Sequence, residues 1–149
     1  MPRTFQGEPF LKKLRADHRE LDQELLKIRG AFQNALNAPA GSPERRRLME
    51  ALQSLREMLV RHFEEEEGEG CLWEAASFNT SLCGEVKKVL GEHPEMLKRL
   101  DAIIEAVKNG AKREDWGAPA RQEFDQLARI LAEHEAREAA ILESSFPMA

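Results

Sequence analysis

The chain has 149 residues, of which 42% are hydrophobic and 33% are charged, and its formal net charge at pH 7 is −5. This length and composition fit one globular domain over residues 1–149, and the acidic balance argues against a nucleic-acid partner, since phosphate binding needs clustered basic residues. No apolar run approaches the roughly 18–20 residues of a membrane span, and the first residues lack the apolar stretch of a secretory signal, so we expect no membrane partner and a cytoplasmic location.

The first predicted helix is amphipathic and ends at the connection 37–43. Its apolar seam alternates steps of three and four residues, which is the spacing of one helix face. The seam consists of Leu11, Leu14, His18, Leu21, Leu25, Ile28 and Phe32. Ser42 followed by Pro43 is typical of an N-cap with proline at the first helical position, so a second helix is predicted to begin there.

The second predicted helix carries the same kind of seam and ends before Gly68. The seam consists of Leu48, Leu52, Leu55, Leu59, His62 and Glu66. Within the acidic run 64–67, only Glu66 is in register with this seam. The other three carboxylates are expected to face solvent.

A connection is expected over about residues 68–81, because glycine and short polar residues gather there. We expect Trp73 and Phe78 to fold back over the end of the bundle. Cys71 and Cys83 are interpreted as reduced thiols, since their spacing matches no zinc or redox motif.

The third and fourth predicted helices repeat the seam pattern. The third seam consists of Val86, Leu90, His93, Leu97, Leu100, Ile104 and Val107, and the fourth of Phe124, Leu127, Leu131, His134, Glu138 and Ile141. Gly91 and Pro94 bracket His93, and proline disfavours helical geometry at the residue before it. We therefore expect a kink, with a helix start at His93 as the alternative.

The predicted fold class is all-α, with an up-down-up-down antiparallel four-helix bundle. Few residues are β-branched and no apolar-polar alternation is present, so no strand is expected, and short connections favour antiparallel neighbours. At a rise of about 1.5 Å per residue, His18 and His62 lie at similar distances from the turn that joins their helices, as do His93 and His134. All four histidines should therefore lie at one level of the bundle.

Six ionisable seam residues are candidates for a metal site. They are His18, His62, Glu66, His93, His134 and Glu138. Ionisable groups on a buried face are costly unless they are paired or bind a metal, and a histidine with a glutamate four residues later can bind one metal centre. The economical arrangement is a dinuclear site with both glutamates as bridges, two imidazoles on each ion and an oxo or hydroxo bridge. These ligands suit iron or manganese, and zinc is also compatible.

Five residues close to the candidate ligands in the sequence are considered for a supporting role. Metal-bound imidazoles usually donate their second N–H to a carboxylate or a backbone carbonyl. Asp17, Glu92 and Glu133 each directly precede a histidine, but we expect them to face solvent and assign them no role. Phe63 and Met96 flank the site, either as core residues or as walls of a dry access pocket.

Four motifs along the chain carry a family resemblance. They are Asp17-His18-Arg19-Glu20-Leu21, His62-Phe63-Glu64-Glu65-Glu66-Glu67, Glu92-His93-Pro94-Glu95-Met96-Leu97 and His134-Glu135-Ala136-Arg137-Glu138. Together with the closing Phe146-Pro147, they resemble the hemerythrin-like, or HHE cation-binding, family over about residues 10–147. The resemblance implies a four-helix bundle that holds a non-haem di-iron centre and binds O₂ or a related small molecule.

Two positions depart from the oxygen-carrying hemerythrins, which have five histidines. Leu97 stands where those proteins have a second histidine on the third helix, and Ala139 stands where their fourth helix has an aspartate. Glu138 is expected to take over the bridging role. The resulting set of four histidines and two glutamates is similar to that of some hemerythrin-like sensor domains, and it disfavours reversible O₂ carriage.

Three functions are compatible with these residues. The first is a protein with two iron ions that binds or senses O₂, peroxide, NO or iron itself. The second is an enzyme such as a peroxidase, a catalase-like enzyme or an oxidase, without a tyrosyl radical because the chain has no tyrosine. The third is a structural bundle, zinc-filled or metal-free, that acts as an interaction module. A protein partner, of a kind that the sequence does not identify, is compatible with each.

Overall fold

The computed structural model describes residues 7–39, 41–68, 72–110 and 116–145. Within these ranges every regular element is a helix, so the all-α prediction is confirmed. The helices are α1 (Gly7–Leu36), α2 (Pro43–Glu67), α3 (Leu72–Phe78), α4 (Cys83–Gly91), α5 (His93–Asn109) and α6 (Gly117–Ser145), with a short 3₁₀ helix, η1, over Thr80–Leu82. None of the described helices is long and apolar enough to cross a membrane.

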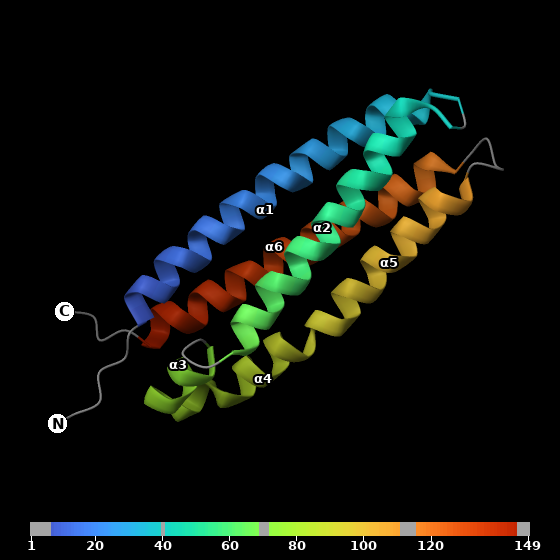
Figure 1. The fold of residues 1–149 in the computed structure, drawn as a ribbon. Coiled ribbons are helices and arrows are strands. Elements are labelled where there is room, and N and C mark those ends of the chain that lie inside the picture. Colours follow the sequence, from blue (N-terminus) through green and yellow to red (C-terminus); the bar gives the residue numbers. More distant parts are fainter. Residues whose placement is uncertain (1–6, 40, 69–71, 111–115, 146–149) are drawn as a thin grey trace.

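The four long helices α1, α2, α5 and α6 form a bundle (Figure 1). Helix α1 packs against α2 and α6, and α5 packs against the same two helices, so each long helix has two long neighbours. The two short helices, α3 and α4, lie at the end of the bundle opposite the connection between α1 and α2 (Figure 1). They contact α6 and each other and close that end.

Helix α2 begins where the sequence predicts it. The Oγ atom of Ser42 accepts a hydrogen bond from the backbone N–H of Arg45 at 3.3 Å, which satisfies one of the free donors at the helix start. Pro43 follows at the first helical position. The preceding Gly41 has a φ of 77°, in the left-handed region that glycine adopts at little cost.

Helix α3 was not expected, because residues 68–81 read as a connection. Its buried face consists of Leu72, Ala75 and Ala76, spaced as one side of a helix. Trp73 and Phe78 lie on the other side and are 43% and 39% exposed, so the prediction that they fold back over the bundle is wrong. The segment does cover the bundle end, but it does so with its small aliphatic face.

The third predicted helix is broken at Glu92 into α4 and α5. The alternative of a helix start at His93 is therefore confirmed in place of a kink, although the residues before it form a helix of their own. Pro94 has no N–H, so the carbonyl of Leu90 receives no helical hydrogen bond from it. The N–H of Glu92 bonds to the carbonyl of Val89 at 3.2 Å, three residues back and not four. In α5 the predicted seam residues Leu100 and Val107 are buried. Met96 and Ile103 are buried in place of the predicted Leu97 and Ile104, which are only half-buried at the edge of the core.

The buried apolar residues form two clusters along the bundle. The larger cluster fills the bundle from the α1–α2 connection up to Leu21, Phe63, Met96 and Leu131. The smaller one joins the far end of α1 and α6 to α3 and α4. On α1 and α6 the predicted ionisable residues fall between the two clusters, and on α2 and α5 they lie at the end of the larger cluster, so a polar layer crosses an otherwise apolar core.

Cys83 is the first residue of α4 and is an exposed free thiol. The other cysteine, Cys71, lies outside the described residues.

Candidate metal centre

The structure brings the six predicted residues together in this polar layer. α1 contributes His18, α2 contributes His62 and Glu66, α5 contributes His93 as its first residue, and α6 contributes His134 and Glu138. The side chain of His18 is 12% exposed and that of His62 is 6% exposed, whereas the other four are at most 2% exposed. The even spacing of the histidines from the turns therefore does place them at one level.

One half of the layer is compact. The Nε2 atoms of His93 and His134 are 3.2 Å apart. His93 Nε2 lies 2.9 Å from Glu66 Oε2, and His134 Nε2 lies 3.0 Å from Glu138 Oε1. One potential ligand atom from each of these four residues lies within 4.8 Å of the others, as a metal ion would require.

The other half contains His18 and His62 and shares the same two glutamates. His62 Nε2 is in contact with Glu66 Oε1, and His18 Nε2 lies 3.9 Å from Glu138 Oε1. These four residues also fall within 4.8 Å of one another. The two oxygens of Glu66 face different halves of the layer, which is the orientation of a carboxylate that bridges two ions.

Several of the converging atoms have no hydrogen-bond partner. These are His18 Nε2, His62 Nε2, Glu66 Oε1 and both carboxylate oxygens of Glu138. A buried polar group that lacks a partner costs about 1–3 kcal/mol. Five such atoms aimed into one layer fit a cation site, because a cation between them would satisfy all of them at once. The nitrogen and oxygen donors, without thiolate, are those that iron, manganese and zinc accept.

The two glutamates respond to burial in opposite directions. Burial raises the pKa of Glu138 well above its ordinary value, and the neighbouring Glu66 raises it further. Burial also raises the pKa of Glu66, but hydrogen bonds from Glu138 and from the surrounding imidazoles outweigh burial and lower its pKa below the ordinary value. Two adjacent buried carboxylates therefore do not ionise equally, because their negative charges repel each other. A cation that binds between them would relieve this repulsion.

The two histidines of the more exposed half also differ from each other. Burial, together with the charge of His62, lowers the pKa of His18 to about 4, so His18 is neutral at neutral pH. Burial lowers the pKa of His62 as well, but contact with Glu66 raises it above its ordinary value. A neutral imidazole has a free lone pair and can bind a metal directly.

Carboxylates lie behind three of the four histidines, and the sequence did not predict a supporting role for any of the three. His62 Nδ1 lies 3.7 Å from Asp17 Oδ2, and His134 Nδ1 lies 3.4 Å from Glu92 Oε1. Asp17 and Glu92 were expected to face solvent, and that expectation is wrong. Glu133 is exposed, as expected. The third acid is Glu67, which lies 3.0 Å from His93 Nδ1.

Phe63 and Met96 belong to the buried core beside the layer. The ring of Phe63 stacks on the ring of His93, with 3.9 Å between centroids and 5° between planes. The burial of both residues and the stacking of Phe63 on His93 favour the interpretation as core residues over that as walls of an access pocket.

Glu135 is a buried acid that the sequence analysis did not single out. It directly follows His134, is 8% exposed, and its Oε1 atom has no hydrogen-bond partner. Burial raises its pKa to about 8, and the charge of Asp22 adds to the increase. Its spacing from Ala128 and Leu131, both buried, places it at the edge of the same helix face and could have indicated its burial.

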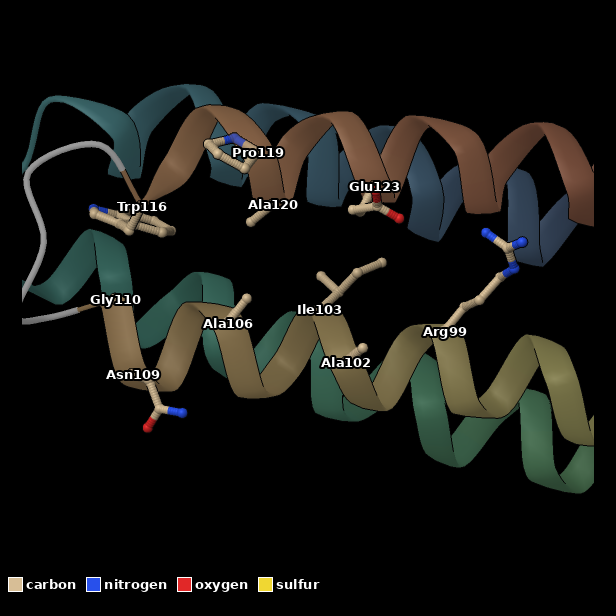
Figure 2. Close-up of a pocket in the computed structure, with 10 residues that line it drawn as sticks. All are labelled: Arg99, Ala102, Ile103, Ala106, Asn109, Gly110, Trp116, Pro119, Ala120 and Glu123. Carbon is tan, nitrogen blue, oxygen red and sulfur yellow. The ribbon is translucent and has the colours of Figure 1, made fainter.

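Two cavities differ in their relation to the layer. A small one of about 130 Å³ lies between α1 and α2 and reaches His62, with Asp17 and Glu65 on its wall. A larger one of about 560 Å³ lies between α5 and α6 and contains no histidine. Figure 2 shows Trp116 at one end of this larger cavity and Arg99 at the other. The larger cavity is therefore separate from the candidate metal centre.

One of three comparisons with known proteins gives a match, and it agrees with this geometry. The model of the family described as the hemerythrin HHE cation binding domain matches residues 9–144. Searches of the curated proteins and of the solved structures find no match to this chain.

Proposed function

The chain belongs to the hemerythrin HHE cation binding domain family, and from this premise we propose that it holds two iron ions in the polar layer and binds a small molecule there. The proposed ligands are His18, His62, Glu66, His93, His134 and Glu138, with both glutamates shared between the ions. The observation that carries the proposal is the set of buried, unpartnered nitrogen and oxygen atoms that converge from four helices.

Imidazole and carboxylate donors accept iron, manganese and zinc, and we propose iron among these because the chain belongs to the hemerythrin HHE cation binding domain family. A pair of redox-active ions with open coordination positions would bind O₂, peroxide or NO. The protein's part is to hold four imidazoles and a bridging carboxylate pair in a largely buried layer. Apolar clusters lie on either side of this layer.

The proposal extends to the rest of the molecule. The chain acts as a single domain over residues 1–149, with its long helices in the up-down-up-down order that the short α1–α2 connection supports. A cytoplasmic location, and no nucleic-acid or membrane partner, remain part of the proposal. The proposal also includes iron itself as the species that is sensed, since the same six residues would bind it.

The first test is the metal content of protein expressed in iron-supplemented medium. We expect about two irons per chain, as in other carboxylate-bridged dinuclear bundles, and near-ultraviolet absorption that bleaches on reduction. His62→Ala and Glu66→Ala should each lower the iron content, because each removes a ligand from the layer. Glu64→Ala is the matched control, since Glu64 lies on the same helix and is exposed.

Two full irons per chain in both ligand variants would contradict the assignment. Circular dichroism on the same samples establishes whether the variants keep their helices. Zinc alone, or no metal under any loading condition, would favour the structural bundle. Spectra recorded before and after addition of O₂, peroxide or NO identify the small ligand, and steady consumption with added reductant would indicate an enzyme.

A further inference from the structure

The two halves of the polar layer differ in what supports their imidazoles from behind. In the half with His93 and His134, the outer ring nitrogen of each histidine meets a carboxylate, at 3.0 Å from Glu67 and at 3.4 Å from Glu92. Glu92 is itself held, because the guanidinium of Arg137 donates to its other oxygen at 2.7 Å. Each ring is thus fixed with its Nε2 atom pointing into the layer.

The half with His18 and His62 has weaker support. Asp17 Oδ2 is 3.7 Å from His62 Nδ1, which is beyond hydrogen-bond distance. For His18, no side chain in the described ranges makes an ion pair or hydrogen bond with the outer nitrogen Nδ1. The carboxylate nearest its inner nitrogen, Glu138, is 3.9 Å away.

Packing around the two halves follows the same division. His93 and His134 are 2% and 1% exposed, and the ring of Phe63 stacks on His93. His62 borders the small cavity between α1 and α2, and His18 is the most exposed of the four histidines. An ion in the His93–His134 half would therefore lie in a drier and more rigid environment.

We propose that Glu67 and Glu92 are positioning residues that make the His93–His134 half the tighter of two unequal metal positions. Metal is then taken up in two steps, the first between His93, His134 and the shared glutamates, and the second between His18, His62 and the same glutamates. A carboxylate behind an imidazole fixes its tautomer and raises its basicity, which strengthens metal binding. This inference rests on the proposed function, because it assigns unequal affinities within the same layer.

The break between α4 and α5 explains how Glu92 reaches this position. Glu92 is the single residue between the two helices, held by its N–H bond to Val89 and by the bond from Met96 N–H to its own carbonyl. Pro94 prevents the helix from running through this point. The side chain of Glu92 can therefore meet both His134 and Arg137 on α6.

The test is a titration of the full chain with Co²⁺, followed by visible absorption and by competition with a chelator of known affinity. Wild-type protein should take up two ions in two resolved steps. Glu67→Gln and Glu92→Gln should each weaken the first step by about 10- to 100-fold, the usual effect of losing such a carboxylate, and change the second step much less. The controls Glu64→Gln and Glu95→Gln remove the same charge from exposed positions of α2 and α5 and should leave both steps unchanged.

A second variant tests the order of the steps. His18→Ala should abolish the weaker step and keep the first, with circular dichroism showing that the helices remain. Two equal steps in the wild type, or a loss in both glutamine variants no larger than in the controls, would overturn the inequality and leave the proposed function standing. Failure of the wild-type chain to take up any ion would overturn the proposed function together with this inference.

Discussion

At the scale of single residues, Glu135 gives the metal-free molecule a pH dependence. Its pKa is about 8 in the folded chain, mainly because of burial, against 4.5 for the free side chain. The folded state therefore binds this proton more tightly than the unfolded state does. The stability that the group contributes is fully present below about pH 4.5 and is lost as the pH rises through about 8.

Glu135→Gln removes the titrating group and keeps the size of the side chain. We expect the variant to match the wild type near pH 5 and to be more stable by about 1–3 kcal/mol near pH 9, an order-of-magnitude value from the shift in pKa. Urea denaturation of metal-free protein at pH 5, 7 and 9 measures the difference.

Glu133→Gln is the matched control for this prediction, because Glu133 lies two residues away on the same helix and is exposed. Its stability difference from the wild type should not change with pH. Equal pH profiles for the two glutamine variants would contradict the role given to burial at Glu135.

At the scale of helices, spacing predicted some elements and not others. The seams of α1, α2 and α6 could be predicted because each runs over several turns with one apolar face, and Ser42-Pro43 gave a start signal for α2. Helix α3 has only seven residues and one buried face of three small or medium side chains, too short for a periodic pattern. In α5, Leu100 and Val107 were predicted correctly, but spacing did not decide between Met96 and Leu97 or between Ile103 and Ile104, because each pair is adjacent and apolar.

Helix α3 contributes to stability through Leu72, which is fully buried in the smaller apolar cluster. Leu72→Ala should lower the free energy of unfolding by about 2–4 kcal/mol, because it deletes buried methyl groups and leaves a cavity. Trp73→Ala, on the exposed side of the same helix, should cost about 1 kcal/mol or less. Chemical denaturation of both variants decides whether α3 is part of the cooperative fold, and equal losses would show that it is not.

At the scale of the whole molecule, the candidate ligands could be predicted from sequence and their supports could not. A helix rises by a constant amount per residue, so distances from the turns are enough to bring four histidines to one level. The carboxylates behind His93 and His134 belong to residues at a helix end and at a helix break, and the direction of their side chains does not follow from spacing. Glu67 lies at the end of α2 and Glu92 between α4 and α5, where the 3.6-residue period no longer applies.

The position of the polar layer between two apolar clusters determines how the fold should respond to loss of metal. Both clusters are made of aliphatic and aromatic side chains that pack without any ion. Removal of iron by a chelator should therefore lower the melting temperature and leave the helical circular dichroism signal largely unchanged. A ligand present at about 100 times its dissociation constant stabilises the folded state by about 2.7 kcal/mol. For a chain of this size, that corresponds to a fall of about 5–10 °C on removal.

His134→Ala provides the comparison for this last experiment, because it removes a ligand from the half of the layer proposed to bind first. Its melting temperature should be nearly insensitive to the chelator, whereas the wild type should regain its higher value when iron is restored. Collapse of the helical signal on chelation would mean that the ions, and not the two apolar clusters, hold the bundle together. An unchanged wild-type melting temperature would mean that no ion binds the folded chain preferentially, since preferential binding must raise its stability.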